Sequence, residues 1–193
     1  MHTVTFSLGT EAALGLANSL HGPGAHHRRR ARLDDATHDH LASPADAREF
    51  LVSHAIPDPG APPTERQLAR LRGIRGLIRS LADDPALDLE AWRMDLDEGL
   101  ASIAFRLGAD GSIRSAASGW DGIADDLGPA ALALAEERSR LRHCGNPLCR
   151  WLFVDRSPGC RRVWCDAAVC GNRMRVGRHR GRALEVAPGS PPR

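Results

Sequence analysis

Residues 144–182 read CGNPLCRWLFVDRSPGCRRVWCDAAVCGNRMRVGRHRGR and hold every cysteine of the 193-residue chain. Four of them form two close pairs, Cys144-x4-Cys149 and Cys165-x4-Cys170, and Cys160 lies between the pairs. This pattern is typical of a four-thiolate zinc site, because each tight turn supplies two thiolates and the longer connection brings the pairs together. Spacing alone does not choose the ligands, since Cys160-x4-Cys165 is also a plausible pair. We expect one structural zinc ion rather than disulfides or inert thiols.

The charge of the chain divides at this stretch. Residues 1–137 carry 13 arginines and 21 acidic residues, a net charge of −8, whereas residues 138–182 carry 12 arginines and two aspartates, a net charge of +10. Lysine is absent from the chain, so the use of arginine rather than lysine carries little information, whereas the clustering of the arginines is informative. Such asymmetry indicates that the C-terminal part meets a polyanion.

The upstream sequence predicts several elements from periodicity and capping. Residues 2–6 resemble a short strand, and residues 11–20 and 44–54 resemble helices, the second with Ser43 as N-cap. Residues 64–81 form the clearest helix, with a Thr64/Gln67 capping box and apolar residues at spacings of three and four. We expect its other face to carry Arg66, Arg70, Arg72 and Arg79.

Further along, Asp110-Gly111 predicts a β-hairpin of residues 101–107 and 112–117. Residues 123–141 predict a long helix, which Gly128-Pro129 should break or restart. We therefore expect an α+β protein. Residues 1–137 would form a mainly helical N-terminal domain with a β-hairpin. Residues 138–185 would form a four-cysteine zinc-finger module with an arginine-rich C-terminal helix. Residues 186–193 would form a disordered tail.

The cysteine stretch resembles the CGNR zinc-finger family. Residues 170–173 spell its signature, Cys-Gly-Asn-Arg, and residues 144–149, 151–155 and 161–165 agree with it. Residues 16–20, Leu-Ala-Asn-Ser-Leu, resemble the opening motif of the ABATE domain that usually precedes this finger. The resemblance implies a bacterial regulator of transcription linked to stress responses. It places the metal ligands on Cys144, Cys149, Cys165 and Cys170, although Val163 is an insertion relative to the family pattern.

The arginine-rich end predicts binding of double-stranded DNA. A helix that starts at a zinc site can present guanidinium groups to phosphates or to guanine edges in the major groove. The candidate DNA contacts are Arg161, Arg162, Asn172, Arg173, Arg175, Arg178, His179, Arg180 and Arg182. Asn172 can instead complete a local turn, and a merely solvated arginine-rich helix is the simpler alternative. Trp151, Phe153 and Trp164 are expected to form the small core of the finger rather than to stack on bases.

Cys160 stands where the family usually has a polar turn residue. Arg156, Arg161 and Arg162 surround it, and positive charge favours the reactive thiolate. It is therefore a candidate redox residue, with a tolerated surface substitution as the simpler interpretation.

The remaining motifs exclude more than they support. His38-Asp-His40 can touch a metal, but a solvated loop is the simpler interpretation. The sequence contains no nucleotide-binding glycine loop, nucleophile elbow or His-Glu-x-x-His motif, so we expect no enzyme. No apolar run is long enough for a membrane span, and the start does not resemble a signal peptide, which predicts a cytoplasmic protein.

Two function classes are left open. The first is a zinc-dependent DNA-binding regulator whose N-terminal domain binds an unknown effector or protein. This regulator could also form a homodimer. The second is a zinc/thiol redox-switch or protein-interaction module that binds an acidic partner protein. Binding to plain duplex DNA that weakens with salt distinguishes them.

Overall fold

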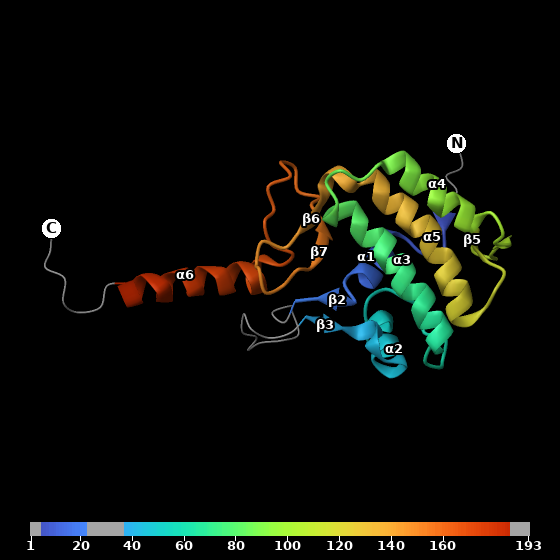
Figure 1. The fold of residues 1–193 in the computed structure, drawn as a ribbon, viewed down its shortest axis with the longest axis horizontal. Helices are drawn as coiled ribbons and strands as arrows, with labels where there is room; N and C mark the ends of the chain where they lie inside the picture. The colour runs from blue at the N-terminus through green and yellow to red at the C-terminus, as the bar shows by residue number, and fades with distance from the viewer. Residues whose placement is uncertain (1–4, 23–36, 186–193) are drawn as a thin grey trace, which may run out of the picture. The chain divides into compact units, whose positions relative to one another are not determined.

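The computed structural model describes residues 5–22 and 37–185, with side chains as far as Arg178. The chain divides into two compact units, one of residues 5–20 and 38–141 and one of residues 21–22, 37 and 142–185. Figure 1 traces the helices and strands of both. The tail predicted at residues 186–193 lies outside the described residues, as do residues 2–4 of the predicted first strand.

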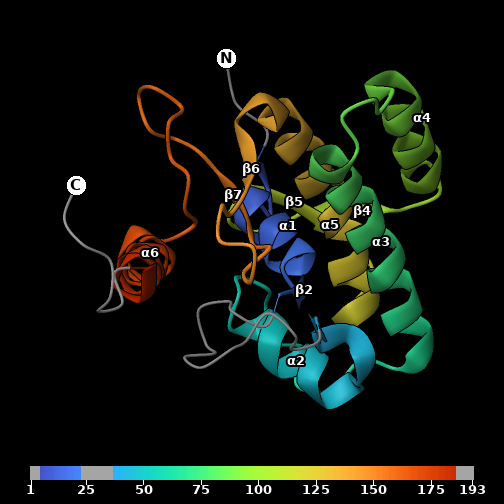
Figure 2. The ribbon, with the colours of Figure 1, turned by 60° about the vertical axis from the view of Figure 1, so that its left-hand side comes forward.

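Three helices form the centre of the first unit. Helices α1 (Thr10–Ala17), α3 (Glu65–Asp83) and α5 (Gly119–Glu136) pack against one another, as Figures 1 and 2 show from two directions. The 3-10 turn η1 (His40–Ala42) and helix α2 (Pro44–Val52) pack against α3, and helix α4 (Leu89–Leu100) packs against α5. The core is mainly leucine and alanine, as the scarcity of aromatic residues requires.

A small sheet covers one side of α5. Strand β5 (Ser112–Ser115) pairs in parallel with β1 (Thr5–Phe6) and antiparallel with β4 (Phe105–Leu107). The predicted hairpin is therefore confirmed, although its strands are shorter than the predicted ranges 101–107 and 112–117. Two buried aspartates of α5 fix the sheet on the helix. Asp126 accepts hydrogen bonds from the Ser115 N–H at 2.6 Å and the Ser7 hydroxyl at 2.7 Å, and Asp125 accepts one from the Ser115 hydroxyl at 2.5 Å.

Local capping signals are confirmed where they were predicted. Thr64 and Gln67 form a capping box at the start of α3, and the Ser43 hydroxyl accepts a hydrogen bond from the Asp46 N–H at the start of α2. Helix α4 was not predicted, although its signals are present. Asp88 caps its first turn, and Trp92 and Leu96 are buried one turn apart. The strand β2 (Leu20–His21), which pairs with β3 (His38–Asp39), ends the predicted helix 11–20 early.

The prediction that Gly128-Pro129 breaks the last helix of this unit is wrong. Helix α5 runs without interruption through Pro129 and ends at Glu136, so residues 137–141 are not part of it. Proline removes one helical N–H donor and crowds the preceding turn. Here residues 122–131 are all buried, so packing on every side holds the helix together against that local cost.

The prediction that Arg79 points away from the apolar face of α3 is also wrong. Arg79 is buried and donates hydrogen bonds to the carbonyls of Ala17 and Leu20, both at 3.2 Å. One turn earlier, buried Arg75 holds the Asp39 carboxylate at 2.5 and 2.9 Å and reaches the Ser19 hydroxyl at 3.1 Å. These guanidinium groups supply hydrogen bonds to polar groups of the segments beside α3 and so tie those segments to the helix.

The Asp39–Arg75 pair is the best-formed charge pair of this face. Burial alone would raise the pKa of Asp39, but hydrogen bonds from Arg75 and from the Leu41 N–H lower it below its usual value. A carboxylate with a lowered pKa stabilises the fold above its ordinary pKa of about 4, and that stabilisation is lost as pH falls through the lowered value.

We predict that Arg75→Met destabilises the protein by about 2 kcal/mol at neutral pH, because Asp39 loses its cation while a third of it stays exposed. Urea unfolding followed by circular dichroism measures the change. The difference from wild type should shrink as pH falls below the ordinary carboxyl pKa of about 4 and through the lowered pKa of Asp39. Arg106→Met, at an exposed position, is the control and should change stability by less than about 0.5 kcal/mol. An equal loss in both variants would contradict the assignment.

Candidate metal centre

A short hairpin places the first two cysteines. Strands β6 (Leu141–His143) and β7 (Leu152–Val154) pair, and Cys144 follows β6 directly. The Cys144 N–H donates to the Trp151 carbonyl at 2.8 Å, and the Cys149 N–H donates to the Asn146 carbonyl at 2.8 Å. The tight turn expected from Gly-Asn-Pro therefore aims both thiols to the same side of the hairpin.

A wide helical turn places the second pair. Residues Ala167–Gly171 form a π-helical turn, η3, which leads into helix α6 (Asn172–Glu185). The Asp166 side chain caps the turn by accepting hydrogen bonds from the N–H groups of Ala168 and Val169. Cys165 thus precedes the cap and Cys170 lies at the end of the turn, immediately before α6.

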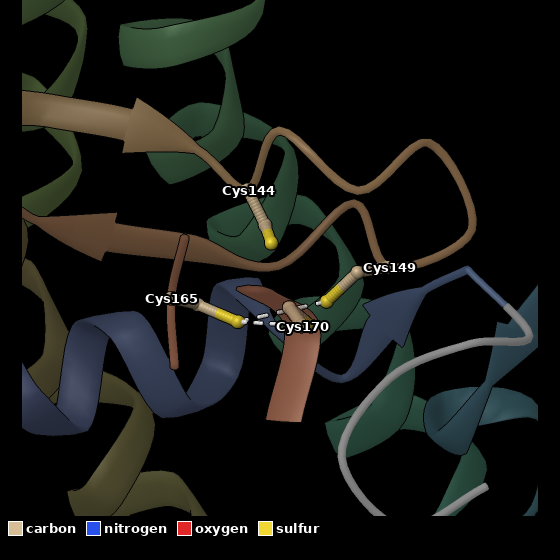
Figure 3. A group of neighbouring side chains, drawn as sticks. All are labelled: Cys144, Cys149, Cys165 and Cys170. Atoms are coloured by element: carbon tan, nitrogen blue, oxygen red, sulfur yellow. Dashed lines mark hydrogen bonds between the residues drawn. The ribbon is translucent and has the colours of Figure 1, made fainter. Parts of the chain in front are cut away.

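The four cysteine side chains gather at one place, as Figure 3 shows. The sulfurs of Cys149 and Cys165 are 3.7 Å apart, those of Cys165 and Cys170 are 3.8 Å apart, and all four lie within 4.8 Å of one another. A tetrahedron of sulfurs at the usual zinc–sulfur distance of about 2.3 Å has an edge of about 3.8 Å. A disulfide needs about 2.05 Å, so these buried thiols are free and their spacing fits one zinc ion.

The thiols compete for negative charge. Hydrogen bonds from Cys149 and Cys165 lower the pKa of Cys144. The same interactions raise the pKa values of Cys149 and Cys165, and burial raises them further. The protein alone therefore favours few thiolates here, whereas a divalent cation favours four, and metal binding would release protons. A zinc ion bound by four cysteines holds the chain together and leaves no open position for catalysis.

A small apolar core and one amide surround the thiols. Phe153 is buried against the four cysteines, and Trp151 and Trp164 pack on the same cluster, as predicted. The Asn146 side-chain amide donates a hydrogen bond to the Cys170 sulfur at 3.6 Å. A Cβ at Gly171 would come within 2.9 Å of the Trp164 ring, which explains why the residue after Cys170 is glycine.

Cys160 lies outside the four-thiol group. It is half-buried, has a left-handed φ of 47°, and its sulfur is 3.7 Å from the Asp155 carbonyl. Buried Asp155 fixes this loop by accepting hydrogen bonds from Ser157 and from the Arg162 N–H. The hydrogen bond from the Ser157 hydroxyl lowers the pKa of Asp155. The inserted Val163 is exposed, and its carbonyl accepts the Gly145 N–H at 2.8 Å, so the loop absorbs the insertion.

The residues predicted to contact DNA differ in their exposure and in their contacts within the unit. Arg161, Asn172, Arg175 and Arg178 are exposed, and Arg173 is half-buried. Arg162 is exposed but engaged within the unit, because its guanidinium bonds the carbonyls of Trp164 and Cys165 and lies 4.8 Å from the Phe153 ring centroid. The predicted contacts whose side chains lie outside the described residues are His179, Arg180 and Arg182.

Two residues far upstream belong to the same unit as the cysteines. The Gly22 N–H donates to the Cys149 carbonyl at 2.8 Å, and the His21 ring lies 5.9 Å from the Trp151 ring. A Cβ at Gly22 would come within 2.3 Å of the Leu148 carbonyl oxygen, so this close approach requires glycine. Sequence analysis missed both residues, because no local signal ties them to cysteines more than a hundred positions away.

Comparison with known families agrees with this geometry. The model of the CGNR zinc finger matches residues 140–183. The ABATE model, described as "putative stress-induced transcription regulator", matches residues 10–139. No curated protein matches the chain. None of the described helices is both long enough and apolar enough to cross a membrane.

We predict about one zinc ion per purified chain, measured by mass spectrometry of the metal, with its loss in Cys144→Ser and in Cys170→Ser. Both variants should lose protection from amide hydrogen exchange in residues 144–178, because the small apolar core cannot hold the unit alone, while α3 and α5 keep theirs. Serine replacements that keep a full zinc complement would show that these two thiols are not ligands.

We predict that Cys160→Ser keeps the full zinc content, because its thiol is outside the group of four. The rate of zinc release by mild peroxide is then compared between the wild type and the variant, to test whether Cys160 is a redox residue. Slower release from the variant supports that role, and equal release supports a tolerated substitution. Zinc loss from untreated Cys160→Ser would instead make Cys160 a ligand.

Proposed function

Because the chain belongs to the ABATE family, whose model covers residues 10–139, we propose that it regulates transcription by binding double-stranded DNA through its zinc finger. The observation that carries the proposal is helix α6, an exposed arginine-bearing helix that starts directly after the metal centre. Zinc bound by Cys144, Cys149, Cys165 and Cys170 would be structural, and we propose no catalytic role for it.

The start of α6 is held rigidly at the metal centre. Cys170 is tied to Asp166 by a 2.9 Å backbone hydrogen bond, and its sulfur belongs to the four-thiol group. Helix α6 begins two residues later, at Asn172. Zinc binding would therefore fix the first turn of the helix and the direction in which it leaves the metal centre. A helix held at one end can be presented to the major groove, which is wide enough to admit it.

The zinc-finger segment also carries a large positive charge. Residues 138–182 have a formal net charge of +10, and four thiolates with one zinc ion would leave about +8. Arg175 and Arg178 are exposed and one turn apart on α6. Among the described residues, each guanidinium makes one 3.4 Å hydrogen bond, from Arg175 to the Gly171 carbonyl and from Arg178 to the Met174 carbonyl. Such guanidinium groups can bind phosphates by releasing counterions from DNA. Arg162 contributes less, because it holds the finger together.

A protein-interaction or redox module is the second candidate function. The exposed arginines that suit phosphates also suit an acidic protein surface, and Cys160 lies beside three arginines in the sequence. In both cases the first unit would receive the signal, from an effector or partner that its sequence does not identify. A reducing compartment such as the cytoplasm suits free thiols in either case.

We predict that the full-length, zinc-loaded protein binds duplex DNA and that the logarithm of its affinity falls linearly with the logarithm of salt concentration. Arg175→Glu and Arg178→Glu should each weaken binding to unrelated sequences. Each lost phosphate contact should reduce the slope of that line by about 0.9. Fluorescence anisotropy of labelled duplexes over a salt series gives both quantities.

The matched control is Arg106→Glu, an equal charge reversal at an exposed arginine of the first unit. It should leave the slope unchanged, which separates a local effect of α6 from one of net charge. Zinc content is measured in each variant. No binding by the zinc-loaded wild type at low salt would contradict the proposal and favour the protein-interaction module.

A further inference from the structure

A second group of metal-ligating side chains lies in the first unit, far along the chain from the cysteines. It consists of His38 from β3, His40 from η1 and Asp46 from the first turn of α2. Sequence analysis favoured a solvated loop for His38-Asp-His40, and this is wrong, because His40 is buried and packs in the core. One ligand atom from each of the three residues lies within 4.8 Å of the other two.

The backbone directs both histidines to one side. Alternate residues of an extended segment point to the same face, so His38 and His40 share a face that Asp39 does not. Asp39 points to Arg75 instead and is held there by two hydrogen bonds. The Ser19 carbonyl accepts the His40 N–H at 2.8 Å. The segment that carries the two histidines is therefore held in place by the Asp39 carboxylate and by the His40 N–H.

The side chains are ordered as well. The His40 ring stacks on Phe50 with ring centroids 4.0 Å apart, and the His38 ring meets the His40 ring edge-on at 4.1 Å. Asp46 is placed by the N-terminal turn of α2, where its N–H donates to the Ser43 hydroxyl. Three side chains held in position before a ligand arrives are what a metal site needs for affinity.

The distances fit a divalent ion. The His38 Nε2 and Asp46 Oδ2 atoms are 3.4 Å apart, and the His40 Nδ1 and Asp46 Oδ1 atoms are 2.8 Å apart. Nitrogen and oxygen ligands about 2.0–2.1 Å from zinc in a tetrahedron are about 3.3 Å apart. The His38–Asp46 separation matches this value. The His40–Asp46 contact is a hydrogen bond to the other carboxylate oxygen, so metal binding would replace it and turn the partly exposed Asp46 carboxylate toward the ion.

We propose that His38, His40 and Asp46 bind a second divalent metal ion of the zinc class, distinct from the structural zinc of the finger. Two imidazoles and a carboxylate suit zinc, nickel, cobalt or iron rather than calcium or magnesium. Three protein ligands leave a coordination position for water, so this ion exchanges more readily than one enclosed by four buried thiolates. His38 and Asp46, 30% and 37% exposed, give it a path from solvent.

The ion would join two elements that the fold already brings together. Its ligands come from the β3–η1 segment on one side and from α2 on the other, and both pack against α3. Binding would therefore stabilise α2 against the centre of the first unit. Whether or not the finger binds DNA, the ion would make this unit responsive to the supply of a transition metal.

The test uses the full-length chain without a histidine tag and with its finger zinc in place. Equilibrium dialysis against excess Zn²⁺, followed by metal analysis, should give about two ions per chain for the wild type. His38→Gln and Asp46→Asn should each bind about one, and circular dichroism should show that they remain folded. Cadmium-113 NMR of the cadmium-loaded protein should show two resonances, one in the range of sulfur ligands and one in the range of nitrogen and oxygen ligands.

Two controls make the assignment local. His54→Gln removes a histidine that stacks on the other face of Phe50 and lies outside the ligand group, so it should keep the second ion. Replacing His26 and His27 together, which lie outside the described residues, should also keep it. A wild type that binds no second ion, or a second ion that both His38→Gln and Asp46→Asn retain, would overturn the proposal.

Discussion

The convergence of four buried sulfur atoms is the constraint on which the C-terminal unit depends. Sulfurs 3.7–3.8 Å apart cannot all carry negative charge without a cation among them, and Phe153 with two partly buried tryptophans is too small a core to hold the segment alone. The hairpin turn, the Asp166 cap and the wide turn of η3 all serve to aim thiols at one point. The direction of α6 follows from that point, since the helix starts where the last cysteine ends.

Several features of the fold and of the metal centre were predictable from the sequence because their signals are local. The Thr64/Gln67 capping box, the Ser43 cap and the Asp110-Gly111 turn each act within a few residues, and each appears where the sequence placed it. The grouping of Cys144, Cys149, Cys165 and Cys170 was also suggested by spacing, although spacing could not exclude Cys160. Helix α4 could have been found by the same reasoning, from Asp88 and the buried Trp92 and Leu96.

The errors arise where tertiary contacts decide. Arg79 and Pro129 each break a local expectation, and in both cases burial against other segments determines the outcome. A guanidinium can be placed inside a protein only if carbonyls or carboxylates from elsewhere in the chain meet it, and no periodicity shows those partners. The same holds for His38 and His40, whose ordered packing depends on Phe50, Asp46 and the ion pair of Asp39.

The participation of His21 and Gly22 in the cysteine unit has a consequence for how the protein is made. The ribosome synthesises these two residues more than a hundred positions before the Cys149 carbonyl and the Trp151 ring that they meet. Assembly of this unit therefore waits until the cysteine segment has been synthesised, however early the first unit folds. For the same reason, the finger is not a cassette that recombination can move intact, since a copy cut out at the family boundary near residue 140 would leave part of its structure behind.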